Sequence, residues 1–419
     1  MTSSMLQINN KAKYSIRDIF SEFEEIITVR DKKNILLSKI ENDKLFVDYP
    51  KLKKIPKDNG KMRDIYISHP VDNARQLIIY NYLYNKYNYL MNKNVVSYQQ
   101  GLSTIKIMQD ILYQIKNIKN KNHIKIVILD LTDYFNSTPI DLILQCKEKY
   151  LQDLKPEYSY YLEEFFKIDH YWYQGNLCYK KPSLQVGSAI SAFFANLVLK
   201  EFDDSISNNP NVLLYRRYAD DLILIVDEAN VENVITKVSE DINKLGLKVN
   251  DTKTKVFDKE MFEWVGIQVN NLETLTLSEK HWKRRKHLIK SICKKYKVKI
   301  SKIGKDDKKR EQLFEQMIRT INKWLYYMQE NMSNATYIYR VNYKEAGDIY
   351  KFNGYIKDTI RQAYTGHYNK ANFIKCPDYK IYSAGYLDFS LMHKVYKSNK
   401  YIFHAILKKH LGYRYEIKI

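Results

Sequence analysis

Residues 212–226 read VLLYRRYADDLILIV, so two apolar runs flank the carboxylate pair Asp220-Asp221. Apolar runs of this length, separated by a short polar step, predict two buried strands joined by a tight turn. Two adjacent carboxylates in such a place would repel each other and would lose their hydration. We therefore expect a cation to compensate them, which marks the turn as a candidate functional site.

Adjacent aspartates alone are uninformative in this chain, because Asp203-Asp204 and Asp306-Asp307 also occur. Those two pairs stand in polar or helix-end contexts, which are typical of solvated surface. The apolar neighbours on both sides distinguish Asp220-Asp221 from them.

A third carboxylate ends another apolar run. Residues 123–130 read HIKIVILD, a β-branched stretch typical of a buried strand that ends at Asp130. Mg²⁺ is held by one or two carboxylates together with substrate phosphates. We expect Asp130 to join Asp220 and Asp221 across a sheet and to bind two Mg²⁺ ions, with Mn²⁺ as the alternative ion. Two such ions activate a hydroxyl nucleophile and stabilise the leaving pyrophosphate in nucleotidyl transfer.

The surrounding pattern predicts a mixed α+β fold. Strands are expected at 61–67, 171–179, 212–226, near Val249 and at 262–269. Helical spacing of apolar residues is found at 72–91, 140–170, 188–202 and 231–245. Residues 1–60 resemble a helical lead-in. Beyond Leu275 the chain is basic, rich in tyrosine and helical in pattern.

The composition of the 419 residues limits the function classes. The chain is long enough for two or three packed subdomains, which excludes a small binding module. No run of about 18 apolar residues could span a bilayer, and the polar N-terminus lacks a secretory signal pattern, so we expect a cytoplasmic protein with no membrane partner. The net charge of +21 favours nucleic acid as a partner, although the many Lys, Asn, Ile and Tyr residues also fit an AT-rich genome.

Five ordered motifs resemble those of reverse transcriptases. Tyr218-Ala219-Asp220-Asp221 resembles the signature of this family, and DLTDYF (130–135) resembles its first metal motif. The other three are GSAIS (187–191) with Asn196, LGLKVN (245–250) with Lys253, and FEWVG (262–266). Upstream, GKMR (60–63) and SYQQGLS (97–103) resemble fingers motifs of the bacterial enzymes. The resemblance covers roughly residues 55–270.

The resemblance implies a right-hand polymerase of the α+β class, with fingers, a palm built on an antiparallel sheet, and a helical thumb with a C-terminal extension. The lead-in and fingers would occupy residues 1–125 and the palm residues 126–275, with fingers elements interleaved at about 140–185. The basic thumb and extension would occupy residues 276–419.

The same resemblance implies roles for individual residues. The backbone carbonyl of Leu131 would join the metal shell. The ring of Phe135 would exclude the ribose 2′-hydroxyl and so favour DNA as product, unless it is an ordinary core residue. Lys253 is either a general acid that protonates pyrophosphate or a solvated turn lysine. The implied nucleotide-binding residues are Lys61, Arg63, Asp133, Tyr134, Phe135, Gly187, Ser188, Ser191 and Asn196.

Among these, Arg63 is the favoured triphosphate contact because a guanidinium binds phosphate in a bidentate manner. Arg63 and Lys61 could equally be ordinary surface cations. The implied primer and template contacts are Tyr218, Trp264, Gly266, Lys283, Arg284 and Arg285. A basic helix followed by aromatic residues suits a thumb that grips a phosphate backbone, although it also fits a solvated helix on an aromatic core.

One motif departs from the family. Gln185-Val186-Gly187 stands where the family often has Pro-Gln-Gly, so Val186 replaces a glutamine that usually touches the nucleotide. This Val-Gly form of the motif resembles the form in the abortive-infection and orphan groups of prokaryotic reverse transcriptases. The Asn-Ala-x-x-His and Val-Thr-Gly patterns of retron enzymes are missing from the sequence, and no nuclease motif is found. We therefore expect a stand-alone polymerase in anti-phage defence.

Its partners would be dNTPs, an RNA template, a DNA product and a dedicated non-coding RNA, with self-association or a partner protein as further expectations. The alternatives are a template-independent or protein-primed DNA polymerase of the same fold, an RNA-dependent RNA polymerase, and an inactive RNA-binding scaffold. The scaffold would be free to lose a metal ligand, whereas all three carboxylates are present.

Overall fold

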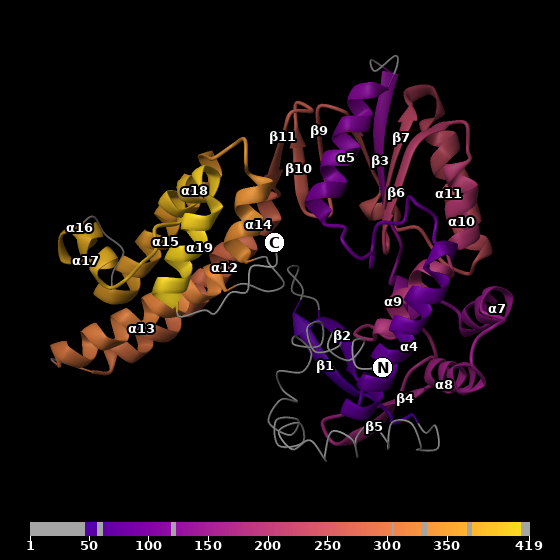
Figure 1. The fold of residues 1–419 in the computed structure, drawn as a ribbon, viewed down its shortest axis with the longest axis horizontal. Coiled ribbons are helices and arrows are strands. Elements are labelled where there is room, and N and C mark those ends of the chain that lie inside the picture. The colour runs from indigo at the N-terminus through magenta and orange to yellow at the C-terminus, as the bar shows by residue number, and fades with distance from the viewer. Residues whose placement is uncertain are drawn as a thin grey trace. The chain divides into compact units, whose positions relative to one another are not determined.

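The computed structural model describes residues 47–56, 62–118, 123–303, 306–327, 333–366 and 371–411. These residues form two compact units (Figure 1). The first unit holds the described residues up to Leu102 together with Asn117–Asp258, and the second holds Ser103–Lys116 and the described residues from Lys259 onward. Antiparallel sheets, helices and a helical C-terminal region confirm the expected α+β class. The proposed division at 125 and 275 stays a prediction.

The central sheet of the first unit has the strand order β6-β7-β3-β8, and all its neighbouring pairs are antiparallel. The strands are β6 (Val212–Tyr218), β7 (Asp221–Asp227), β3 (Ile124–Asp130) and β8 (Lys255–Asp258). The two middle strands, β3 and β7, are almost entirely buried because their residues are apolar apart from Lys125 and the aspartates at their ends. The predicted strands at 123–130 and 212–226 are confirmed.

Helices cover this sheet and complete one apolar core. They are α4 (Pro70–Tyr87), α7 (Ile140–Tyr150), α8 (Pro156–Phe166), α9 (Ala189–Leu197), α10 (Lys200–Ser207) and α11 (Val231–Lys244). On α11 the buried residues Val231, Val234, Val238 and Ile242 recur every three or four positions, which gives the helix one apolar face. Short helical turns are α6 (Tyr134–Ser137), η2 (Asn88–Leu90), η4 (Glu228–Asn230) and η5 (Asp251–Lys253).

A second sheet of the first unit has the order β2-β1-β4-β5. Its strands are β1 (Lys51–Pro56), β2 (Met62–Ile67), β4 (His170–Tyr173) and β5 (Asn176–Tyr179). The predicted hairpin around Gln174-Gly175 is confirmed, and both residues adopt positive φ. The helical lead-in expected over 1–60 is wrong at 51–56, where β1 pairs with β2. Residues 1–46 lie outside the described residues.

Two other expectations fail locally. The single helix expected at 188–202 is two helices, α9 and α10, separated at Val198-Leu199. The backbone leaves helical geometry at Leu199, with a φ of −100° and a ψ of 8°, so α9 ends there and α10 begins. The strand expected near Val249 is one bridge to Leu131, because the chain enters η5 immediately afterwards.

The second unit combines a small sheet with helices. The sheet order is β11-β10-β9, with β9 (Met261–Trp264), β10 (Ile267–Asn270) and β11 (Thr274–Leu277). The longer helices are α5 (Thr104–Asn117), α12 (Glu279–Ser301), α13 (Asp307–Tyr326), α15 (Gly347–Thr365) and α19 (Lys400–Leu411). The shorter ones are α14 (Asn334–Val341), α16 (Asn372–Lys375), α17 (Asp378–Ser383) and α18 (Phe389–Ser398). Within the described part of the chain, we find no helix with the length and apolarity needed to cross a membrane.

Candidate active site

Three carboxylates gather at one end of the central sheet. Asp130 is the last residue of β3 and lies directly opposite Asp221, the first residue of β7. Asp220 stands in the turn between β6 and β7, and its carbonyl accepts a hydrogen bond of 3.0 Å from the backbone N–H of Leu131. Strand register therefore brings together residues that are about 90 positions apart in the sequence.

A cavity of about 870 Å³ opens beside this end of the sheet. Both Asp130 and Asp220 line it, whereas Asp221 does not. The other predicted site residues in its wall are Arg63, Leu131, Asp133, Tyr134, Phe135, Gly187, Ser188 and Lys253. Lys61 lies outside the described residues. The cavity thus unites the residues predicted for metal, triphosphate and sugar recognition.

Burial raises the pKa of the Asp220 carboxyl, and the nearby Asp130 raises it further, while Lys253 and Arg63 act in the opposite direction. The ammonium group of Lys253 lies 2.9 and 2.8 Å from the two carboxylate oxygens of Asp130. The Lys253 side chain is 60% exposed, so we expect this ion pair to exchange readily with other cations. The electrostatics of the pocket thus favour added positive charge.

The pocket carboxylates fit a divalent cation in their chemistry, because they offer only hard oxygen donors. Among the described residues no group of three or more His, Cys, Asp and Glu side chains is arranged to hold a metal ion by itself. A cation at Asp130 and Asp220 would therefore complete its shell with backbone, water or substrate oxygens, as Mg²⁺ commonly does.

The cavity wall also contains Tyr134 and Phe135, whose rings meet edge to face at 5.8 Å. Tyr134 is fully buried and donates a hydrogen bond of 2.5 Å to the carbonyl of Ala195. Asp133, which precedes them, has a φ of +45° and accepts a hydrogen bond from Asn136. Tyr134 therefore anchors the turn and leaves Phe135, which is only partly buried, at the cavity surface.

Gly187 adopts a φ of +111° where the chain passes close to β2. A Cβ atom there would lie 3.0 Å from both Cγ2 of Ile65 and the carbonyl of Tyr66. The backbone N–H of Tyr66 also donates to the carbonyl of Val186 at 3.0 Å. The glycine therefore lets the start of α9 approach the strand that carries Arg63.

Two of the predicted nucleotide contacts lie elsewhere. Ser191 is fully buried, and its hydroxyl accepts from the backbone N–H of Gln185 at 2.9 Å. Asn196 is also buried and exchanges hydrogen bonds with Ser97. Neither residue lines the cavity. Their nucleotide roles stay predictions, while their contacts support a role within the fold.

Several cavity residues were not assigned a role from the sequence, among them Gln76, Tyr98 and Asn250. Gln76 on α4 is 1% exposed and donates to the hydroxyl of Ser68, while its amide oxygen has no hydrogen-bond partner among the described residues. Tyr98 also lines the cavity and has a φ of +57°. Asn250 binds the backbone carbonyl of Asp130 through its own N–H at 2.8 Å. The motif around Lys253 could have indicated Asn250, but no local signal indicates Gln76.

The predicted primer and template contacts are spread over both units. Tyr218 ends β6 in the first unit, and the others belong to the second. Trp264 is buried, and Gly266 forms the β9–β10 turn against the ring of His281, which a Cβ atom would meet at 2.3 Å. On α12, Lys283 and Arg284 are exposed, whereas Arg285 is partly buried above the ring of Tyr337. Their roles stay predictions.

Residues 55–269, just over half of the 419-residue chain, match the family described as reverse transcriptase (RNA-dependent DNA polymerase). The chain belongs to the reverse transcriptase family. The matched range contains the central sheet of the first unit, strands β2, β4 and β5 of its second sheet, and Asp130 and Asp220 of the cavity. Family membership thus agrees with the expectation drawn from the five motifs.

A related reverse transcriptase is the Retron Ec83 reverse transcriptase of Escherichia coli, which is 28% identical over 145 residues. The match covers 34% of this chain and 39% of that protein, so the chain spans well under two thirds of this relative's length. Two solved telomerase structures are also similar. Apo telomerase from Candida tropicalis, truncated from the C-terminal domain, is 15% identical with a TM-score of 0.42 and 55% coverage of both chains. Telomerase from Candida albicans with a fragment of telomeric RNA is 12% identical with a TM-score of 0.43, covering 88% of this chain and 65% of that one.

Proposed function

We propose that this protein is an RNA-directed DNA polymerase that extends a primer by nucleotidyl transfer assisted by two metal ions. The observation that carries the proposal is the shared cavity of Asp130 and Asp220, whose wall also contains Arg63 and Phe135. Membership of the reverse transcriptase family supports the same reaction.

Asp130, Asp220 and the carbonyl of Leu131 would hold the ions, with Asp221 next to them in the sheet register. Bound Mg²⁺ or Mn²⁺ would lower the pKa of the primer hydroxyl and neutralise charge on the phosphates. The guanidinium of Arg63 would bind the triphosphate in a bidentate manner. Lys253, released from Asp130, would donate a proton to the leaving pyrophosphate.

The ring of Phe135 would select deoxynucleotides by occupying the space of a 2′-hydroxyl. Its neighbour Tyr134 is held by the hydrogen bond to Ala195, which leaves little freedom for the loop that carries both rings. A ring on a fixed backbone can exclude an added oxygen atom by steric overlap.

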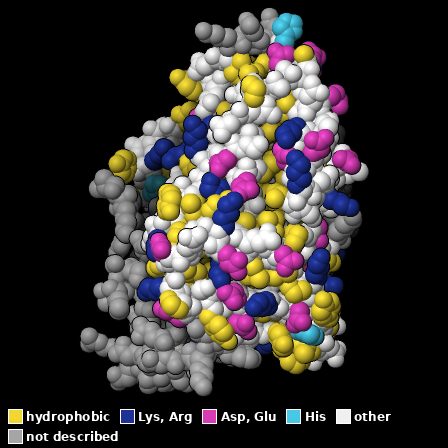
Figure 2. Space-filling model, turned by 90° about the vertical axis from the view of Figure 1, so that its right-hand side faces the viewer, with side chains coloured by type: hydrophobic (Ala, Val, Ile, Leu, Met, Phe, Trp, Pro, Cys, Tyr) yellow, Lys and Arg dark blue, Asp and Glu magenta, His cyan; other side chains and the backbone are white. Residues whose placement is uncertain are grey.

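Binding of nucleic acid would be concentrated in the C-terminal region. Residues 276–419 contain 32 Lys and Arg residues against 12 Asp and Glu residues, whereas the rest of the chain is nearly neutral. On the face drawn in Figure 2, by contrast, basic and acidic side chains are intermingled. Basic side chains gathered in one region favour a phosphate backbone as the partner.

A role in anti-phage defence, with a dedicated non-coding RNA as template, is the biological setting that we propose. It rests on the resemblance to defence-associated groups, and a retron enzyme is among the relatives. Plaque counts would test it. Expression of the intact protein with its native flanking sequence should lower plaque numbers, and expression of the Asp220→Asn variant should not. Equal protection by both proteins would favour the scaffold.

The biochemical test is incorporation of labelled nucleotides by the purified protein with Mg²⁺. Parallel reactions would contain dNTPs or rNTPs, and copurified RNA would be retained or removed by nuclease. The Asp130→Asn and Asp220→Asn variants serve as controls with the same shape. We expect dNTP incorporation only by the intact protein and only with RNA present. Incorporation that survives complete RNA removal would instead support the template-independent alternative.

A further inference from the structure

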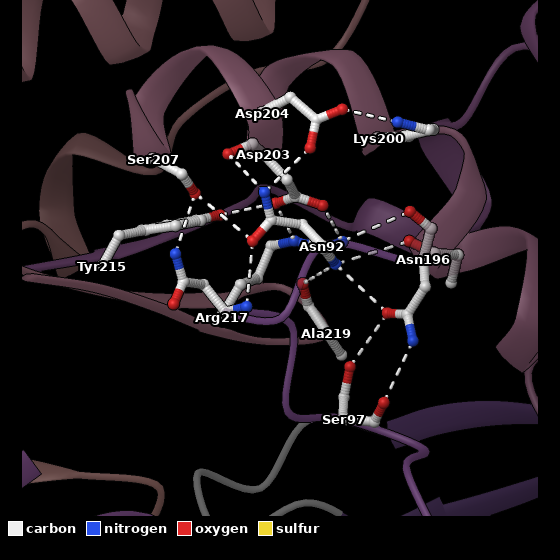
Figure 3. A network of polar contacts seen from close by, with 12 residues as sticks. Asn92, Ser97, Asn196, Lys200, Asp203, Asp204, Ser207, Tyr215, Arg217 and Ala219 are labelled. Carbon is white, nitrogen blue, oxygen red and sulfur yellow. Dashed lines mark hydrogen bonds and ion pairs between the residues drawn. The ribbon is translucent and has the colours of Figure 1, made fainter. Parts of the chain in front are cut away.

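A fully buried ion pair lies behind the turn that carries Asp220 (Figure 3). Arg217 on β6 and Asp203 on α10 are both completely buried. The guanidinium donates two hydrogen bonds to the carboxylate, from Nε to Oδ1 at 2.8 Å and from Nη2 to Oδ2 at 2.6 Å. The hydroxyl of Tyr215 donates another to Oδ1 at 2.7 Å. These contacts fix the plane of the guanidinium.

An ion pair is an inefficient way to fill a core. Two buried charges lose about as much hydration energy as their attraction returns, and apolar side chains of similar volume often stabilise a fold equally well. An arginine adds direction, because its planar fork presents donors at fixed angles. The groups that receive its remaining hydrogen bonds therefore indicate what the pair does.

One of those remaining hydrogen bonds goes to the backbone of the turn that carries Asp220, and the others go to α9. Arg217 Nη1 donates to the carbonyl of Ala219 at 3.1 Å. Longer contacts of 3.3 to 3.5 Å reach the carbonyls of Ala195 and Asn196 and the side chain of Asn196. The carbonyl of Ala219 belongs to the peptide bond that leads into Asp220. The guanidinium thus fixes the orientation of that peptide.

The turn has a conformation that needs such support. Ala219 has a φ of +56°, in the left-handed region that residues other than glycine rarely adopt. A strained backbone of this kind persists only where its surroundings hold it. The next carbonyl, that of Asp220, is held by the N–H of Leu131 at 3.0 Å. Two successive carbonyls of the turn are therefore fixed by separate elements.

The network also joins a third segment to the turn. The backbone N–H of Arg217 donates to the carbonyl of Asn94, and its carbonyl accepts from Val96. Ser97 and Asn196 exchange two hydrogen bonds, of 2.9 and 3.0 Å. Figure 3 shows Ser97 bonded to Asn196, which in turn contacts Arg217. Arg217 is therefore the common member of the network.

We propose that Arg217 and Asp203 are positioning residues for the carboxylate of Asp220. This inference rests on the proposed polymerase function and extends it to a pair that does not line the cavity. Asp203 orients Arg217, and Arg217 holds the Ala219–Asp220 peptide, so the Asp220 carboxylate keeps the direction needed at the reacting centre. Loss of the pair would lower turnover more than nucleotide affinity.

The test replaces the pair by apolar side chains of similar volume, in the double variant Arg217→Met/Asp203→Leu. A second variant, Arg217→Lys, keeps a charge opposite Asp203 but lacks the planar fork. A control with the same substitutions in a partly exposed ion pair, Lys237→Met/Asp241→Leu, changes α11 away from the cavity. Three quantities are measured for each protein: kcat and KM for a dNTP, the unfolding temperature, and the rise of that temperature on addition of Mg²⁺ alone.

We expect both Arg217 variants to be folded, with kcat at least tenfold lower, KM for the dNTP within about twofold of the intact protein, and a smaller Mg²⁺-induced rise. The control should match the intact protein in all three. Folded variants with unchanged kcat and unchanged Mg²⁺ response would overturn the proposal. If the double variant does not fold, Arg217→Lys decides the question. If the intact protein incorporates no nucleotide, the proposed function fails. The positioning role is then tested by comparing the Mg²⁺-induced rise in unfolding temperature between the intact protein and the Arg217 variants.

Discussion

At the scale of single residues, Phe135 is the side chain that would decide which nucleotide enters the cavity. It lies in the cavity wall on a turn fixed by Tyr134. We expect Phe135→Val to raise rNTP incorporation relative to dNTP incorporation by about tenfold or more, because steric overlap of this kind costs about 1–3 kcal/mol. The ratio of kcat/KM for matched dNTP and rNTP pairs measures this. An unchanged ratio would assign Phe135 to the core and leave sugar selection unexplained.

Gln76 lines the same cavity as Val186, and its amide oxygen is buried. Its oxygen lacks a partner among the described residues, while its nitrogen is held by Ser68 at 2.9 Å. We expect Gln76→Leu to raise KM for dNTPs by roughly five- to tenfold, since one neutral hydrogen bond contributes about 1 kcal/mol. Ser68→Ala is the matched control for loss of the internal hydrogen bond alone. Equal KM in Gln76→Leu and the intact protein would show that the amide is structural.

At the scale of elements, the contact between β2 and the start of α9 depends on Gly187. We expect Gly187→Ala to lower the free energy of unfolding by about 2 kcal/mol or more, from a disfavoured φ and the close contact with Tyr66. Gly175→Ala is a matched control, because Gly175 also has positive φ but has no atom within 4 Å of an added Cβ. Urea unfolding measures the free energy of unfolding of both variants. Equal decreases would mean that the close contact between Gly187 and β2 does not contribute to stability.

The helical elements of the second unit contain a buried histidine that should make stability depend on pH. Burial lowers the pKa of His393 to about 4, and Lys397 adds to the effect. Between about pH 6.5 and 4, His393 is protonated in the unfolded chain but stays neutral in the folded chain. The free energy of unfolding therefore falls as the pH decreases from 6.5 towards 4. The loss should approach roughly 3 kcal/mol at most. Unfolding of the second unit, measured between pH 7 and 4.5, should lose this slope in His393→Leu, and an identical slope would contradict the assignment.

The elements also show how far sequence reasoning reaches. The strands at 123–130 and 212–226 were predictable because apolar runs adjoin their carboxylates, at 126–129 before Asp130 and at 222–226 after Asp221. The break between α9 and α10 was not predictable, because no Gly or Pro marks the backbone change at Leu199. Gln76 was likewise hidden, since its position in the cavity depends on how α4 meets the strands. The carboxylates could be named from one sequence because their apolar context is local.

At the scale of the whole molecule, charge is distributed unevenly along the chain, with most of the excess beyond residue 275. The double variant Arg284→Gln/Lys290→Gln changes the exposed surface of α12, and we expect it to weaken nucleic-acid binding. The steepness of the fall of log binding constant with log salt concentration should decrease by about one per lost phosphate contact. Lys237→Gln/Lys244→Gln on α11 changes the net charge equally and serves as the control. Fluorescence anisotropy across a salt series measures both, and equal slopes would place the nucleic acid elsewhere.

The whole protein is proposed to be a polymerase that copies RNA into DNA. The most direct measurement is the sequence of the product made by the purified protein with Mg²⁺, dNTPs, and a defined RNA with a paired primer. We predict DNA complementary to the supplied RNA, made by the intact protein and absent with Asp130→Asn. DNA of a sequence unrelated to the RNA, or equal synthesis by the Asp130→Asn variant, would contradict the account.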